Sequence, residues 1–118
     1  MPLTPTAVTR AAEAGMGIGS FNDLIAALHA AVPVPLVLHG SSGVADAGMT
    51  TAVARGMTKI NIATHLNKAF TEAVRAHLAA DPHVVDTRRY LGDGRDAVAR
   101  EVARLLGVLE SAGTAAAA

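Results

Sequence analysis

The chain has 118 residues, with 10 basic and 10 acidic side chains, five histidines and no cysteine. This length supports one domain, but it is well short of the roughly 200 residues that the smallest closed (β/α)8 barrels need. The balanced charge leaves no electrostatic footprint for nucleic acid or an anionic membrane, and the lack of cysteine excludes disulfides and thiolate metal sites.

No run of apolar residues reaches the roughly 18 that a membrane-spanning helix requires. The opening residues 1–5 lack the basic and apolar regions of a secretory signal. The sequence therefore predicts a soluble, cytoplasmic protein with no nucleic-acid partner and no membrane partner.

The predicted elements alternate between helices and strands along the chain. Helices are expected over about 6–14, 23–31, 45–56, 65–80 and 94–109, and strands over 17–22, 34–38 and 58–64. The apolar run 34–38, bounded by turn residues, is typical of a strand buried on both faces. Asn22 or Asp23 is the expected N-cap of the second helix, and capping is also the expected role of Asp46. This alternation predicts an α/β fold with three parallel strands, too few to close a barrel.

Polar residues gather after two of the expected strands. His39-Gly40-Ser41-Ser42-Gly43 follows the second strand, and Asn61, Thr64 and His65 follow the third. Ligands of parallel α/β folds bind at these strand ends, where glycines and helix N-termini let backbone N–H groups approach an anion. The two loops therefore predict a phosphate cradle. The alternatives are an ordinary turn for the glycine-rich stretch and a hydrogen-bonded strand-end residue for His39.

The remaining histidines offer no complete metal site. Catalytic zinc needs about three protein ligands, and a lone His39 cannot supply them. His29, His77 and His83 are expected to be solvated surface residues. His65 lies close to Asn61 in the sequence. It is therefore expected either to face the same pocket as Asn61 or to point away from it.

Two loop motifs resemble a known family. They are Pro35-Leu-Val-Leu-His-Gly-Ser-Ser-Gly-Val44 and Gly56-Met-Thr-Lys-Ile-Asn-Ile-Ala-Thr64. Together they resemble the class II fructose-bisphosphate and tagatose-bisphosphate aldolases. The stretches Asp86-Thr-Arg-Arg-Tyr-Leu91 and Glu110-Ser-Ala-Gly113 are similar to later segments of that family, and residues 1–22 are similar to its start. The resemblance covers residues 33–113 and implies one partial (β/α)8 TIM-barrel domain over 1–118.

The resemblance also implies the chemistry. Such enzymes are zinc-dependent lyases of carbohydrate metabolism, including glycolysis, which cleave a ketose bisphosphate reversibly to dihydroxyacetone phosphate and an aldehyde. By this resemblance His39 is a zinc ligand. The substrate, a phosphorylated sugar, would bind at the loop residues Gly40, Ser41, Ser42, Asn61, Ile62, Ala63 and Thr64.

The sequence departs from the family chiefly by what it lacks. Asn22 leads almost directly to the segment before the family's seventh strand, so the middle of the barrel is missing. The family's proton-transferring Asp and two further zinc-binding histidines are missing with it, and no catalytic residue is assigned here. An Ala63-Thr64 pair is closer to the tagatose-bisphosphate branch.

Two interpretations follow from this. In the first, the chain is an internally deleted aldolase that is inactive as an isolated polypeptide. In the second, it is a non-catalytic remnant that binds phosphate or associates with itself through exposed sheet edges and apolar helix faces. A decayed gene product without function is a third possibility that the sequence does not separate from the second.

Overall fold

The computed structural model describes residues 18–117, with the side chains of residues 23–115. In chain order the elements are α2 (Ile18–Ala31), β1 (Leu36–Leu38), the 3-10 turn η1 (Ser41–Gly43), α3 (Asp46–Ala54), β2 (Met57–Ile60), α4 (Thr64–Ala80), α5 (Thr87–Val108) and the 3-10 turn η2 (Thr114–Ala117). The chain divides between Asn61 and Ile62 into two compact units, each described by itself below.

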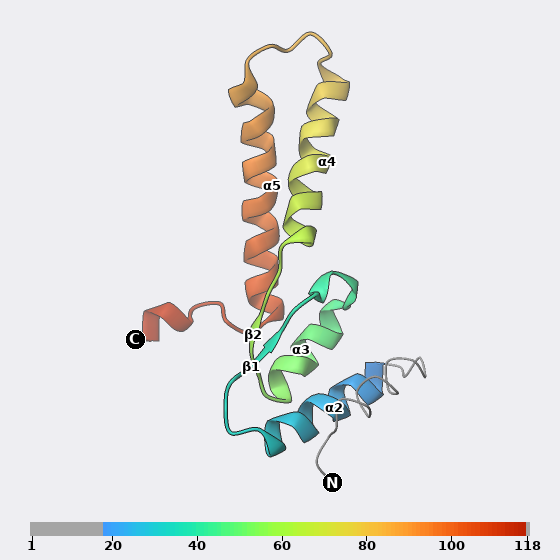
Figure 1. Cartoon of the computed structure of the whole chain (residues 1–118). Helices are drawn as coiled ribbons and strands as arrows, with labels where there is room; N and C mark the ends of the chain where they lie inside the picture. The colour runs from blue at the N-terminus through green and yellow to red at the C-terminus, as the bar shows by residue number, and fades with distance from the viewer. Residues whose placement is uncertain (1–17, 118) are drawn as a thin grey trace. The chain divides into compact units, whose positions relative to one another are not determined.

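The first unit contains a β–α–β arrangement (Figure 1), in which α3 connects two parallel strands. Leu38 of β1 pairs with Ile60 of β2, and one irregularity interrupts the register between Leu36 and Val37. Asn61 continues the pairing beyond β2, since its backbone N–H donates to the carbonyl of Leu38 at 2.9 Å. The loops that leave β1 and β2 therefore start from neighbouring points at one end of the sheet.

A small apolar core supports this sheet. Ile25 of α2 is 1% exposed, and Met49 and Ala52 of α3 are also buried. The turn from α3 into β2 contacts α2 at Gly56, which lies against the His29 ring. Gly56 has a φ of 116°. Only glycine adopts this φ without strain and leaves room for the ring.

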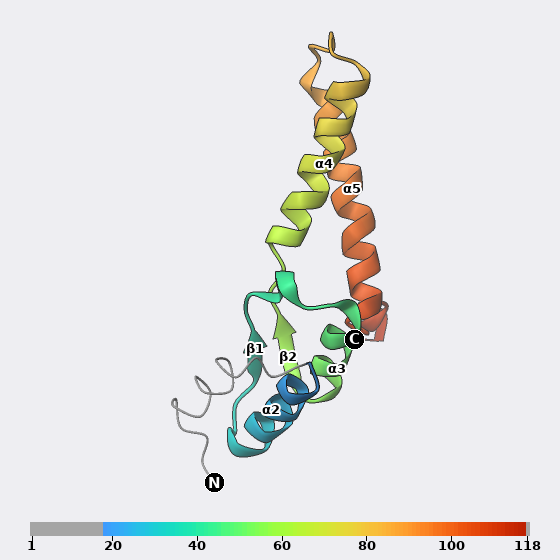
Figure 2. The same cartoon turned by 90° about the vertical axis from the view of Figure 1, so that its right-hand side faces the viewer.

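The second unit is a helical hairpin (Figures 1 and 2), with α4 and α5 packed side by side along their lengths. Gly94 of α5 is buried against the Phe70 ring of α4, and Leu105 is buried as well. The Asp86 carboxylate caps α5 by accepting from the backbone N–H of Arg88 at 3.1 Å. Its hydrogen bonds with Arg88 lower the pKa of Asp86.

The structure confirms a helix-rich α/β fold with a small open parallel sheet, and it corrects several details. The described residues form two strands rather than three. The strand expected over 17–22 is wrong for residues 18–22, which belong to α2. A strand requires a neighbour to satisfy its backbone groups, whereas a helix satisfies them internally. The helix expected over 6–14 lies outside the described residues.

The expected burial of β1 is also wrong. Val37 is 42% exposed, because β1 has one neighbouring strand in the described sheet and no layer covers this side chain. Among the described residues, none of the helices is long and apolar enough to span a membrane.

Helix starts differ from the expected ones. Asn22 and Asp23 lie inside α2 instead of capping it, and α3 is capped by Ala45 without a side-chain hydrogen bond, so Asp46 is not its N-cap. α5 begins at Thr87 rather than near Gly94, because the cap of Asp86 adds two turns at its N-terminus.

Candidate functional site

The loop after β1 turns sharply through Gly40. This residue has a φ of 69°, and apart from Gly40 itself and its two chain neighbours no residue comes within 4 Å of the position where a Cβ would stand. The following residues form η1, closed by a hydrogen bond from the Val44 N–H to the Ser41 carbonyl at 2.9 Å. The sharp turn leaves His39, Gly40 and Ser42 exposed at the end of the sheet.

Ser41 connects this loop to the end of β2. Its side chain is buried, and its Oγ donates to the backbone carbonyl of Asn61 at 2.7 Å. The Ser41 hydroxyl is thus engaged within the protein, whereas Ser42 next to it is exposed.

Asn61 makes three contacts with the first strand and its loop. Its backbone N–H donates to Leu38, its backbone carbonyl accepts from Ser41, and its side-chain Nδ2 lies 2.9 Å from Nδ1 of His39. The structure therefore brings together His39, Ser41 and Asn61, three of the residues that the sequence selected.

The other predicted site residues lie in different surroundings. Gly40 and Ser42 share the loop of His39, but Ile62, Ala63 and Thr64 belong to the second unit. Ala63 caps α4, and its carbonyl accepts from the N–H of Asn67 at 3.0 Å. Thr64 is the exposed first residue of that helix.

His65 pairs with a carboxylate of its own unit. Its Nε2 lies 2.6 Å from Oε1 of Glu101, which also receives two hydrogen bonds from Arg104, at 2.9 and 2.7 Å. The hydrogen bonds from Arg104 are the main cause that lowers the pKa of Glu101 to about 2; partial burial opposes this, and His65 adds to it. The imidazole of His65 therefore makes this contact within the helical hairpin.

His77 corrects the expectation of a solvated surface residue. Its side chain is 15% exposed, with Nδ1 2.6 Å from Oδ2 of Asp93 and the ring tilted against Tyr90. The pairs of His65 with Glu101 and of His77 with Asp93 cross the hairpin, and local sequence does not indicate them. Glu101 and Arg104 lie on one helix and are spaced for contact on one face.

The described residues do not assemble a metal site. Nowhere in residues 23–115 do three histidine, aspartate or glutamate side chains come together to hold an ion. His39, the zinc ligand that the resemblance implies, has its Nδ1 2.9 Å from Nδ2 of Asn61. These residues alone do not fit a catalytic zinc, which takes about three protein ligands.

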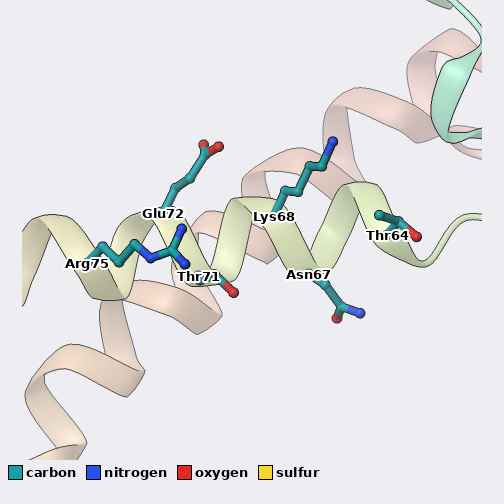
Figure 3. A pocket seen from close by; sticks show the side chains of 6 residues that line it. All are labelled: Thr64, Asn67, Lys68, Thr71, Glu72 and Arg75. Carbon is teal, nitrogen blue, oxygen red and sulfur yellow. The ribbon is translucent and has the colours of Figure 1, made fainter.

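A surface hollow of about 260 Å³ lies along α4 (Figure 3). Its lining residues all come from this one helix: Thr64, Asn67, Lys68, Thr71, Glu72 and Arg75. Only Thr64 is a predicted site residue, and a hollow on one exposed helix face offers a ligand no enclosure. The candidate site is therefore assigned to the loop after β1 and to Asn61 at the end of β2.

Comparison with known proteins identifies the family. The family model described as "Fructose-bisphosphate aldolase class-II" matches residues 20–114. The chain belongs to this family. A fructose-bisphosphate aldolase of Geobacillus stearothermophilus is 43% identical over 83 residues, which are 70% of this chain and 29% of that protein.

A solved structure gives the same result. The YdjI aldolase from Escherichia coli K12 superposes with a TM-score of 0.70 at 33% identity, over 79% of this chain and 34% of that one. The resemblance seen in the sequence is confirmed. The chain spans about a third of the length of these relatives.

Proposed function

We propose that this chain is a partial class II ketose-bisphosphate aldolase, a single partial barrel domain over 1–118, that does not cleave its substrate alone. The reaction of the complete site would be reversible aldol cleavage to dihydroxyacetone phosphate and an aldehyde. The observation that carries the proposal is the cluster of His39, Ser41 and Asn61 at the ends of two parallel strands, in a chain of this family.

The phosphate of the dihydroxyacetone phosphate moiety would bind at Gly40, Ser41 and Ser42. Gly40 has open space beside its backbone and Ser42 is exposed, so both can approach an anion. The hydroxyl of Ser41 bonds to Asn61, so Ser41 would contribute its backbone and hold the loop in shape. Asn61 would also contact the substrate. The substrate roles of Ile62, Ala63 and Thr64, which belong to the second unit, rest on the family resemblance alone.

Zinc would have His39 as one ligand, with the others supplied by a part of the family fold outside this chain. Aldol cleavage also needs a general base within reach of the substrate. Asp23 pairs with Arg55 at 3.3 Å and Asp46 lies in the first turn of α3, so neither is assigned that role. We assign no step of the reaction to zinc in this chain.

Calorimetry on the purified chain tests the binding half of this proposal. We expect dihydroxyacetone phosphate to bind and Ser42→Ala to weaken that binding. Zinc should bind weakly through His39, so His39→Ala should reduce it. His83→Ala, at an exposed loop histidine, is the matched control. The proposed site would be contradicted if Ser42→Ala left the binding of dihydroxyacetone phosphate unchanged and His39→Ala left the binding of zinc unchanged.

Self-association is the second candidate function. Val34 is 57% exposed and Val37 is 42% exposed beside a two-stranded sheet. Apolar side chains next to a strand edge favour pairing with another chain. Sedimentation should show a dimer or a larger species that Val37→Lys reduces, and a monomer at every concentration would overturn this candidate.

We place the protein in the cytoplasm, where the proposed sugar-phosphate substrates are found.

A further inference from the structure

The two helices of the hairpin begin in different ways. α5 starts with the carboxylate of Asp86, which accepts a hydrogen bond from the backbone N–H of Arg88 at 3.1 Å. α4 starts at Ala63, whose methyl group cannot accept such a bond. The first N–H groups of a helix have no partner inside the helix, so a start without a side-chain cap is held less firmly. The position of the first turn of α4 therefore depends on contacts from outside that turn.

The second residue of α4 makes a contact of this kind with α5. Nε2 of His65 lies 2.6 Å from Oε1 of Glu101. Arg104 holds the same carboxylate, with Nη2 donating to Oε1 at 2.7 Å and Nε donating to Oε2 at 2.9 Å. The Glu101 side chain is 18% exposed, so little water competes for its oxygens. Glu101 is therefore oriented on α5 and holds the imidazole that belongs to the first turn of α4.

We propose that Glu101 is a positioning residue that, oriented by Arg104, fixes the first turn of α4 and thereby the place of Thr64. Thr64 is the exposed first residue of α4 and directly precedes His65. Helix ends fray, and fraying of this turn would move the backbone N–H and the hydroxyl of Thr64. The consequence for substrate binding rests on the proposed function, in which Thr64 is a substrate residue, whereas the positioning itself does not.

A second pair of the same chemistry provides a matched control. Nδ1 of His77 lies 2.6 Å from Oδ2 of Asp93, and this pair also joins α4 to α5. His77 lies roughly 18 Å further along α4 than His65, by the rise of an α-helix. Loss of either carboxylate removes one contact across the hairpin, so both losses should lower its stability. Only the loss of Glu101 should move Thr64.

The test is ¹H–¹⁵N NMR of the full chain, measured at the backbone amide of Thr64. We expect Glu101→Ala to shift this signal and Asp93→Ala to leave it in place. Glu101→Gln keeps an oxygen that accepts hydrogen bonds, so it should retain the signal of the unmodified chain. Arg104→Ala removes only the orientation of the carboxylate and should shift the signal in the same direction, which keeps the test decisive if Glu101→Ala does not fold. Circular dichroism shows which variants are folded.

An unchanged Thr64 signal in the folded Glu101→Ala or Arg104→Ala variant would overturn the proposal, as would an equal shift in Asp93→Ala. Addition of dihydroxyacetone phosphate separates this proposal from the proposed function. It should shift the Thr64 amide in the unmodified chain and in Asp93→Ala, and Glu101→Ala should lose this response. If Glu101→Ala moves Thr64 but dihydroxyacetone phosphate never does, the substrate role of Thr64 fails while the role of Glu101 stands.

Discussion

The two units of this chain are stabilised in different ways. In the first, backbone groups dominate: two parallel strands continue through Asn61, and the Ser41 side chain bonds to a backbone carbonyl. In the second, side chains on two long helices make the contacts, through the pair of His77 with Asp93 and the pair of His65 with Glu101. The first unit positions a loop at the end of its sheet, and the second is a hairpin of two packed helices.

This difference explains where chemistry is expected. Hydrogen bonds to Leu38 and Ser41 hold the backbone of Asn61 at the end of the sheet, so the strands fix the place of its polar groups. The position of the proposed phosphate loop therefore depends on the backbone conformation of Gly40 and Gly56 and on the hydrogen bonds of Asn61. The hairpin depends on close packing at Gly94.

Gly56→Ala should destabilise the first unit most. A Cβ at this position would lie 2.4 Å from the His29 ring, and the φ of 116° disfavours any side chain. We expect a loss of about 3 kcal/mol, measured by urea unfolding. Gly40→Ala is the matched control, since its φ is also positive but its surroundings are open; it should cost about 1 kcal/mol. Equal costs would show that the His29 contact is unimportant.

Gly94→Ala tests the packing of the hairpin. Its Cβ would lie 2.6 Å from the Phe70 ring, and we expect a loss of about 2 kcal/mol in thermal or urea unfolding. Gly92→Ala in the same helix has open space and should instead stabilise, by up to about 1 kcal/mol, through helix propensity. If both variants stabilise, α4 and α5 do not pack closely here.

Ser41→Ala tests the connection between the two strand-end loops. It removes the 2.7 Å hydrogen bond to Asn61 from a buried site and should cost about 1 kcal/mol. It should also weaken binding of dihydroxyacetone phosphate, because the loop loses its anchor. Ser42→Ala, at the exposed neighbour, should leave stability unchanged. Equal stability of the two variants would count against Ser41 as the anchor.

The ionisation of Glu101 should give the smallest effect, which is a pH dependence of the stability of the second unit. Its pKa is lowered to about 2, chiefly by Arg104, so its stabilising contribution is complete above the ordinary glutamate pKa of about 4.3. This contribution is lost as the pH falls toward 2. Melting temperatures across this range should fall less steeply in Glu101→Gln than in the unmodified chain. Glu72→Gln, at an exposed position of α4, should retain the full slope.

Much of the fold follows from local sequence signals. The apolar run before His39 and the β-branched run before Asn61 predict β1 and β2, and the prolines and glycines around them mark where they end. The strand expected over 17–22 failed because a strand depends on a partner elsewhere in the chain, which local sequence does not reveal. The early start of α5 is consistent with Asp86, since aspartate is a preferred N-cap residue.

The sequence predicts which residues form the candidate site, but it does not predict the contacts that these residues make. The polar loops identify His39, Ser41 and Asn61, because parallel strands bring their carboxyl ends together. That Ser41 uses its hydroxyl to bind the backbone of Asn61 depends on the register of β1 and β2. The pairing of His65 with Glu101 depends on how two helices pack, which the sequence of either helix leaves open.

An aldol-cleavage assay tests whether this chain is inactive by itself and whether His39 takes part in a completed site. The purified chain is supplied with zinc and fructose 1,6-bisphosphate or tagatose 1,6-bisphosphate, alone and together with a second polypeptide carrying the rest of the family fold. We predict no release of dihydroxyacetone phosphate by the chain alone, and release in the mixture that His39→Ala abolishes. Turnover by the isolated chain that is lost in His39→Ala would contradict this account.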